Sequence, residues 1–298
     1  MEELSKVKEQ IQFFVKECND KKSLDLLGLL ATGKMLRSKL ILKIAGINDA
    51  SIKLCAVVEM IHAASLLHDD VIDEADTRRG KPSINAIFDN KTSIMFGDIL
   101  YSKAFMELSQ MPKEISYTIS NSVTLLSIGE MLDVDLTKNF NNSYDKYFDM
   151  IYKKTASLIE ASAKAAAILA NKDKNAFALY GKNLGLAFQM IDDILDITQD
   201  SKTLGKPAML DFIEGKVTIP YLLLHERIED KIKLESLYKK PLSTVDQEWI
   251  KDEMIKHNVL IDSISQAQKL GLEAVNAISD DENEDLKNIM NQMINREF

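Results

Sequence analysis

Two copies of one short acidic pattern stand out in the 298-residue sequence, at residues 69–73 and 192–196. Each reads Asp-Asp-x-x-Asp inside a strongly apolar stretch. On a helix the first and last of these aspartates share one face, with the second just around the turn. Three clustered carboxylates repel one another and are costly to bury unpaired, and a cation would remove that cost. Because Mg²⁺ is usually held by a few carboxylates together with substrate phosphates, the two motifs predict several Mg²⁺ ions that grip one polyphosphate from two sides.

A single motif of this kind in an acidic protein is often only a solvated helix face or a helix N-cap. The flanking residues favour a metal site instead, because residues 57–67 and 184–191 are apolar on most sides of a helix and such helices belong in a core. Acidic triads at the ends of two core helices are expensive without a purpose. The expected metal ligands are Asp69, Asp70, Asp73, Asp192, Asp193 and Asp196.

Three groups of basic residues could complete a diphosphate site. Each group alone could be solvated surface charge, but all three stand beside the acidic stretches or in the loop-like segment 199–220, which combines Gly, Pro and Lys. Long loops in compact domains are usually functional. Arginine offers a bidentate fork for phosphate and lysine a point charge. The six residues are Lys34 and Arg37, Arg78 and Arg79, and Lys206 and Lys216.

The elements that must hold these side chains are predicted to be helices. Apolar residues recur at helical period in residues 151–170, 176–197 and 249–278. With only 5 Pro and 11 Gly, the chain has little of the turn punctuation that an all-β fold needs. No Pro/Gly/Ser-rich linker divides it, and 46% hydrophobic residues are ample for a core. We therefore expect a single all-α domain over residues 1–298.

Charge and composition limit the partners and the compartment. A net charge of −9 argues against nucleic acid, which calls for a basic patch, but not against a phosphorylated small molecule whose contacts metals mediate. The two cysteines, Cys18 and Cys55, imply no disulfide framework and fit a reducing cytosol. The first residues lack the apolar core of a signal peptide, and no uncharged apolar run is long enough to span a membrane. We expect a cytoplasmic protein without stable membrane insertion.

Taken in this order, the motifs resemble those of the trans-isoprenyl diphosphate synthases, the polyprenyl synthetase family. The resemblance runs from about Gly33 to the C-terminus. It implies an all-α fold of antiparallel helices around a deep central cavity, and a homodimer. It also implies condensation of an allylic diphosphate with isopentenyl diphosphate, with about three Mg²⁺ ions in each active site.

By this resemblance, the first aspartate motif binds Mg²⁺ and the allylic diphosphate, and the second holds a further Mg²⁺. Arg78 would grip the allylic diphosphate, and Lys206 and Lys216 would close over it. Lys154 and Thr155 resemble the family's Lys-Thr pair, and Phe188-Gln189 its Phe-Gln pair; Lys154, Thr155 and Gln189 are expected to bind substrate. Thr155 could equally bond its own helix backbone. The residues expected to carry catalysis are Asp69, Asp70, Asp73, Arg78, Lys154, Asp192 and Lys206.

Isopentenyl diphosphate would occupy a second basic pocket. The family usually has Arg and Pro where this chain has Met35 and Ser38, and losing that arginine is expected to weaken the pocket. Taken by itself, His62 would more often be a core residue than a ligand. Residues 97–101, Gly-Asp-Ile-Leu-Tyr, resemble another family signature with an expected structural role. The pocket residues carried over are Lys34, Arg37, His62 and Arg79.

Product length should depend on the residues one helical turn before the first motif. Ala64 and Ser65 precede Asp69 by five and four positions, roughly 6 Å along a helix. Both are small, whereas similar synthases that stop at short products carry an aromatic residue there. We therefore predict a long-chain product, of the octaprenyl type, for a quinone side chain. The alternative is that these two residues only allow close helix packing.

Three other functions compete with this interpretation. A short-chain synthase, making geranylgeranyl or farnesyl diphosphate, would share every motif. A class I terpene cyclase also uses DDxxD, but its second metal motif mixes Asn or Asp with Ser/Thr and Glu, unlike residues 192–196. A non-catalytic subunit of a heteromeric synthase would typically lose acidic-motif residues, whereas this chain keeps all six.

Overall fold

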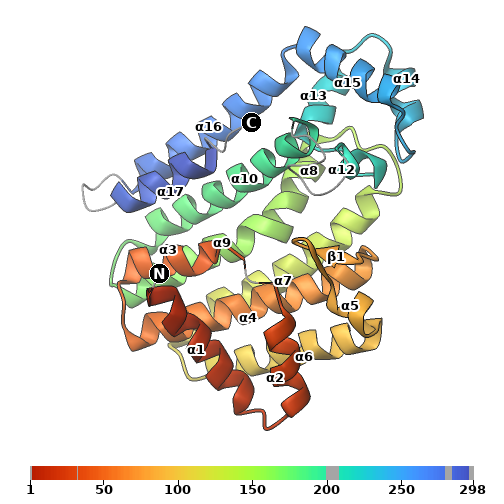
Figure 1. Ribbon diagram of the computed structural model, residues 1–298. Helices are drawn as coiled ribbons and strands as arrows, with labels where there is room; N and C mark the ends of the chain where they lie inside the picture. The colour runs from red at the N-terminus through yellow and green to blue at the C-terminus, as the bar shows by residue number, and fades with distance from the viewer. Residues whose placement is uncertain (1, 32, 199–207, 279–283, 295–298) are drawn as a thin grey trace. The chain divides into compact units, whose positions relative to one another are not determined.

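The computed structural model describes residues 2–31, 33–198, 208–278 and 284–294, and within them the chain is almost entirely helical (Figure 1). The all-α prediction is therefore confirmed. In this described part, a two-stranded antiparallel ribbon is the one piece of β-structure. Residue contacts divide the chain into unit 1, Met1–Val123 with Ala161–Ala178, and unit 2, Thr124–Glu160 with Leu179–Phe298. A single domain over residues 1–298 stays a prediction.

Unit 1 contains the N-terminal helices and the β-ribbon. Its elements, in chain order, are α1 (Glu2–Lys16), α2 (Lys21–Leu29), α3 (Leu36–Ala45), α4 (Asp49–Ile72), β1 (Thr77–Arg78), β2 (Lys81–Pro82), α5 (Ile84–Ile87) and α6 (Asn90–Leu108). Three helices run from one unit into the other: α7 (Lys113–Leu136), α9 (Ser157–Leu169) and α10 (Lys174–Thr198).

Helix α4 is the core helix of unit 1. It begins at a capping box in which Asn48 and Ser51 each accept from the other's backbone N–H, and this satisfies donors that a helix start would otherwise leave open. Helices α1, α3 and α6 pack against it (Figure 1). Among the described residues, α4 is also the one helix long and apolar enough to cross a membrane, but most of its apolar window is buried in protein, as in the core of a soluble fold.

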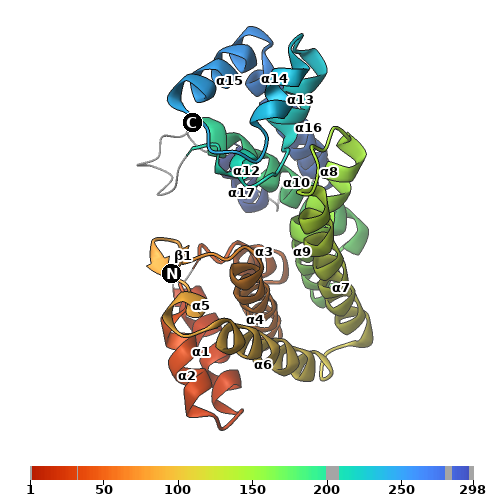
Figure 2. The same cartoon turned by 90° about the vertical axis from the view of Figure 1, so that its right-hand side faces the viewer.

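Unit 2 holds the second half of the chain. Its further elements are α8 (Tyr144–Ile151), the π-helical turn η1 (Tyr152–Ala156), α12 (Leu210–Ile213), α13 (Ile219–Arg227), α14 (Lys231–Leu237), α15 (Thr244–Lys256), α16 (Val259–Ala277) and α17 (Glu284–Ile294). Helix α13, which begins with Pro220 in its first turn, packs against α8, α15 and α16 (Figure 2). Buried residues of α8, α10, α12 and α13 form one hydrophobic core, in which the Phe212 and Tyr221 rings stack 4.3 Å apart.

Candidate functional site

Both acidic motifs lie at the C-terminal ends of long helices. Asp69 and Asp70 belong to the last turn of α4, and Asp73 caps it, with its backbone N–H 2.8 Å from the carbonyl oxygen of Asp69. The second motif lies in the last two turns of α10, where Asp193 and Asp196 are buried. The C-terminal end of a helix carries partial negative charge, so carboxylates there are disfavoured unless a cation compensates them. This placement fits the predicted cation sites.

In the first motif, Asp70 is paired with a predicted basic partner. Its carboxylate accepts from Nε of Arg78 at 2.6 Å, and its side chain is almost fully buried. Burial raises the pKa of Asp70, while Arg78 acts in the opposite direction. The segment after the motif is bonded to the end of α4: the N–H of Ala75 and the side-chain amide of Asn85 both donate to the backbone oxygen of Asp70. The structure thus brings Arg78, which is expected to bind the allylic diphosphate, into contact with the first motif.

The β1–β2 ribbon places the second arginine. Arg79 and Gly80 both have positive φ, 53° and 72°, the backbone pattern of a two-residue type I′ hairpin turn. The Arg79 guanidinium donates to the Ala31 carbonyl at 3.0 Å and lies against Gly33, where its Nη1 is 2.5 Å from the position that a Cβ would take. Glycine at position 33 is therefore what allows this approach.

The predicted isopentenyl diphosphate residues Arg37 and His62 lie near Arg79. Burial lowers the pKa of Arg37 to about 10, with Glu59 opposing and Arg79 adding to the shift. Burial also holds the pKa of His62 well below its ordinary value, and Arg37, Arg79 and Arg78 lower it further. His62 is therefore a neutral ring among arginines and can accept or donate a hydrogen bond without adding charge. Lys34, just before α3, is exposed.

Sequence reasoning missed Glu59 in this basic cluster. Its Oε1 accepts from the backbone N–H of Ser38 at 3.2 Å and from the Ser38 hydroxyl at 2.7 Å. Its charge also raises the pKa of both Arg37 and Arg79, which means that it lies close to each. Ser38, a departure from the family pattern, thus holds the Glu59 carboxylate through two hydrogen bonds; a proline could supply neither donor. The signal was available, because Glu59 precedes His62 by three residues on an otherwise apolar helix.

The second motif sits in a hydrogen-bonded network. Asp193 accepts from the Tyr147 hydroxyl at 2.5 Å through Oδ2 and from Gln189 Nε2 at 2.9 Å through Oδ1. The Thr155 hydroxyl donates to Gln189 Oε1 at 2.9 Å. Burial, and next the charge of Asp211, raises the pKa of Asp193 to about 8. The structure brings Thr155, Gln189 and Asp193, three of the predicted site residues, together. Nothing in the sequence had singled out Tyr147.

A fourth aspartate joins this motif from the segment that follows it. The Asp211 backbone N–H donates to Asp196 Oδ2 at 3.1 Å, and the Met209 N–H donates to the Asp196 backbone oxygen at 2.8 Å. Lys216 is tied to the same segment, since its N–H donates to the Asp211 carbonyl at 2.7 Å and its ammonium lies 2.9 Å from Glu214. Sequence reasoning expected a functional loop here but missed Asp211. Lys206 lies outside the described residues.

Lys154 meets two carboxylates that sequence reasoning also missed. Its ammonium lies 2.9 Å from Glu130 and 2.5 Å from Asp133, both buried on α7. Gly129 abuts the backbone at Lys154, so a larger residue there would push α7 away. Lys154 and Thr155 both lie in η1, and π-helical turns occur frequently at functional sites. A buried Glu-x-x-Asp pair within the apolar stretch 123–136 is the signal that could have exposed this partner.

The residues expected to set product length are buried. Ala64 is fully buried and Ser65 nearly so, with its hydroxyl bonded to the His62 carbonyl. Gly97 of α6 packs on this part of α4, with its Cβ position 3.3 Å from the Ala64 oxygen and in contact with the His68 ring. Gly97 therefore leaves space for the ring of His68, the residue before Asp69. This agrees with a structural role for residues 97–101. Close packing at Ala64 is what the alternative interpretation expects.

The donor set of the two motifs consists of carboxylates, which fits a hard cation. Among the described residues, no three acidic, histidine or cysteine side chains converge into a preformed metal cage. A cation that takes most of its ligands from substrate phosphate and water needs no such cage. The prediction that both motifs share one diphosphate stays a prediction.

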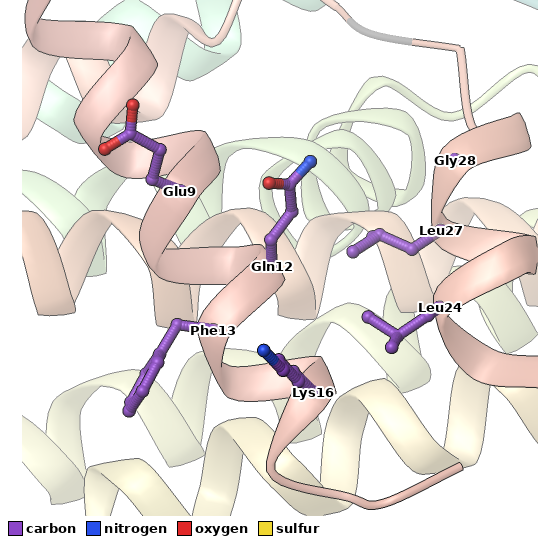
Figure 3. Close-up of a pocket in the computed structure, with 7 residues that line it drawn as sticks. All are labelled: Glu9, Gln12, Phe13, Lys16, Leu24, Leu27 and Gly28. Atoms are coloured by element: carbon purple, nitrogen blue, oxygen red, sulfur yellow. The ribbon is translucent and has the colours of Figure 1, made fainter. Parts of the chain in front are cut away.

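The cavity shown in Figure 3 lies elsewhere in unit 1, between α1 and α2, and has a volume of about 430 Å³. Leu24 and Leu27 point from α2 towards Gln12 of α1. None of the predicted site residues lines it; the lining residues are Glu9, Gln12, Phe13, Lys16, Leu24, Leu27 and Gly28.

Comparison with known sequences gives a family match and several relatives. Residues 26–254 match the family described as polyprenyl synthetase. The chain is 34% identical over 278 residues to octaprenyl diphosphate synthase of Haemophilus influenzae, which covers 90% of this chain and 81% of that protein. It is 33% identical over 271 residues to a short chain isoprenyl diphosphate synthase of Methanocaldococcus jannaschii, covering 87% and 81%. Solanesyl-diphosphate synthase 1 of rice is 45% identical over 174 residues, 57% of this chain. The match spans 40% to 66% of the length of the rice protein and three other relatives.

Solved structures agree with this match. An octaprenyl pyrophosphate synthase from Helicobacter pylori superimposes with a TM-score of 0.92 at 42% identity, covering 98% of each chain. A polyprenyl synthase from Caulobacter crescentus, complexed with calcium and isoprenyl diphosphate, gives a TM-score of 0.89 at 30% identity and covers 99% of this chain and 95% of that one.

Proposed function

Because the chain belongs to the polyprenyl synthetase family, we propose that it is a Mg²⁺-dependent prenyltransferase that joins an allylic diphosphate to isopentenyl diphosphate. The observation that carries this proposal is the pair of aspartate motifs, each at the C-terminal end of a long helix, the first of them paired with Arg78. Buried carboxylates in such positions need positive charge, and a metal-bound diphosphate site supplies it.

The two aspartate triads would hold the cations, about three in each active site, with substrate phosphate completing the ligands. Mg²⁺ would neutralise the negative charge that develops on the departing diphosphate. The complex of calcium and isoprenyl diphosphate in the Caulobacter crescentus protein supports a divalent cation beside this class of ligand.

The basic residues would bind and orient the two substrates. Arg78, Lys154, Lys206 and Lys216 would bind the allylic diphosphate, and Thr155 and Gln189 would help to place it. Lys34, Arg37, His62 and Arg79 would hold isopentenyl diphosphate. When the allylic C–O bond ionises, an allylic carbocation remains, and apolar walls must exclude water from it. The double bond of isopentenyl diphosphate attacks the cation, and the released diphosphate can take the proton that is then lost.

We propose that the product is a long-chain all-trans polyprenyl diphosphate of the octaprenyl type, for a quinone side chain, with farnesyl or geranylgeranyl diphosphate as the starting allylic substrate. The small residues Ala64 and Ser65 support this, as do the octaprenyl and solanesyl synthases among the relatives. A short-chain synthase is the second candidate, because relatives of that name are similar to this chain to the same degree.

We further propose a cytoplasmic homodimer. The support is the exposed apolar surface of α6, where Met95 and Met106 are more than half exposed and Ile94 and Phe105 lie beside them in sequence. Apolar side chains gathered on one helix face are typical of protein–protein contacts. The net charge of −9 fits the absence of nucleic acid among the expected partners.

One experiment tests the proposed activity. The purified single chain is incubated with farnesyl diphosphate, labelled isopentenyl diphosphate and Mg²⁺, and the products are sized; omission of Mg²⁺ is the control. A series of products ending near eight isoprene units is expected, and products of three or four units would favour the short-chain candidate. A cyclase would leave the isopentenyl diphosphate unused, and a non-catalytic subunit would show no turnover alone.

A further inference from the structure

A buried tyrosine that sequence reasoning missed is bonded to the second aspartate motif. The Tyr147 hydroxyl of α8 donates to Oδ2 of Asp193 on α10 at 2.5 Å. Tyr147 is 1% exposed and Asp193 is 3% exposed. The rest of the ring packs in the hydrophobic core of unit 2, and the Phe148 ring lies edge-on to it at 5.3 Å. The core therefore fixes the position of the Tyr147 ring, and the Asp193 carboxylate fixes the direction of its hydroxyl.

The other oxygen of Asp193 accepts a second hydrogen bond, from Gln189, and this bond determines which groups donate and which accept in the network. In the ionised form that binds a cation, Asp193 only accepts hydrogen bonds, so the amide nitrogen of Gln189 faces its Oδ1, at 2.9 Å. The amide oxygen then faces Thr155, whose hydroxyl donates to it at 2.9 Å. The donors run from Thr155 to Gln189 to Asp193, and Tyr147 closes the network from the opposite side.

We propose that Tyr147 is a positioning residue that holds Asp193, and through it Gln189 and Thr155, in the geometry that binds metal-bound diphosphate. The inference rests on the proposed function. With both carboxylate oxygens bonded, Asp193 cannot rotate about its last bond without losing a donor. The Thr155 proton is already used, so its oxygen presents lone pairs to a ligand. The group that contacts Thr155 in the complex is therefore a hydrogen-bond donor, such as water or an ammonium group, and not a bare phosphate oxygen.

The test measures binding of inorganic pyrophosphate with Mg²⁺ by calorimetry, without turnover. Tyr147→Phe removes the hydroxyl and keeps the ring. Removing a residue that is hydrogen-bonded to a metal ligand typically lowers metal affinity 10- to 100-fold. Tyr147→Phe should therefore weaken pyrophosphate binding about tenfold and raise the Mg²⁺ concentration at half-saturation by the same factor. Tyr180→Phe is the matched control, because Tyr180 is equally buried in unit 2 but its hydroxyl bonds the backbone oxygen of Leu286 at 2.6 Å. It should leave both values within about twofold.

The melting temperature separates positioning from structure. Both tyrosine variants lose one buried hydrogen bond and should melt within a few degrees of each other. Equal pyrophosphate binding by the two variants would overturn the proposal, whereas a defect confined to Tyr147→Phe supports it. If Tyr147→Phe does not fold, Gln189→Leu removes the other donor to Asp193 and should raise the Mg²⁺ requirement in the same way; an unchanged requirement there also overturns the proposal.

A double-mutant cycle tests whether Tyr147 acts through Asp193. In an Asp193→Ala background the Tyr147 hydroxyl has lost its acceptor, so Tyr147→Phe should add little further loss of pyrophosphate binding. Full additivity of the two losses would contradict action through Asp193. Wild-type protein that binds no pyrophosphate with Mg²⁺ would instead refute the proposed function itself, which keeps the two failures distinct.

Discussion

The guanidinium of Arg79 occupies the space that a side chain at Gly33 would need, with Nη1 2.5 Å from the Cβ position. The segment just before Lys34 and the β-ribbon therefore lie in contact here. Gly33→Ala should displace Arg79 and raise the KM for isopentenyl diphosphate about tenfold, with a smaller change for the allylic substrate. Gly28→Ala is the control, since no atom lies within 4 Å of its Cβ position. Equal kinetics for the two variants would remove Arg79 from the isopentenyl diphosphate pocket.

Asp69→Ala should lower turnover about a thousandfold or more at saturating Mg²⁺, because a metal ligand is lost where charge develops on the leaving group. Asp76→Ala removes an exposed carboxylate from the following turn and serves as the control. Circular dichroism should show unchanged helicity in both. Activity of Asp69→Ala near the parent level would contradict the metal assignment, and Asp193→Ala is expected to behave like Asp69→Ala.

Lys34→Ala should raise the KM for isopentenyl diphosphate more than the KM for the allylic diphosphate, because Lys34 is exposed and precedes Arg37 of α3 by three residues. Lys39→Ala, exposed on α3, should leave both constants unchanged. Initial rates with one substrate varied at a time give the two constants. The opposite pattern would mean that the two pockets have been exchanged.

Ala64→Phe should shorten the product if the growing chain passes this position. Because Ala64 is fully buried, the larger ring should also lower the free energy of unfolding by about 1–3 kcal/mol. Chromatography of the products and a denaturant titration separate the two effects. Lost stability with an unchanged product distribution would leave only the helix-packing interpretation.

The pKa of His62 is held well below its ordinary value of 6.5 by burial and by Arg37, Arg79 and Arg78. Below about pH 6.5, His62 is protonated in the unfolded chain but stays neutral in the folded chain. Folding stability therefore falls as the pH falls through this range. His62→Gln should flatten the decrease in melting temperature between about pH 7 and pH 5.5. His257→Gln is the control, because the His257 ring lies 3.3 Å from the Glu253 carboxylate. An equal pH dependence in wild type and His62→Gln would show that His62 is accessible to protons.

Much of this molecule follows from local sequence. Helical periodicity and scarce Pro and Gly predicted the all-α chain, and apolar flanks predicted that both motifs end long helices. Asp70 and Arg78 pair across only eight residues of chain, so their contact is a local one.

Most of the partners that sequence reasoning missed come from other helices. Tyr147 reaches Asp193 across 46 residues, Asp133 reaches Lys154 across 21, and Glu59 reaches Ser38 across 21. Periodicity assigns a residue to a helix face but does not say which residue of another helix it will meet. The π-helical turn was equally out of reach, because its extra residue follows from packing and not from a local pattern.

The η1 turn accommodates one residue more than an α-helix would between α8 and α9. Deleting a single residue from 152–156 would let an ordinary helix run straight through, and everything upstream would then turn by about 100°. Tyr147 would swing to another side of its helix, out of reach of Asp193. The π-helical turn thus sets the rotation of α8 relative to α9 about the helix axis. Deleting or inserting one residue there would be far more damaging than most substitutions.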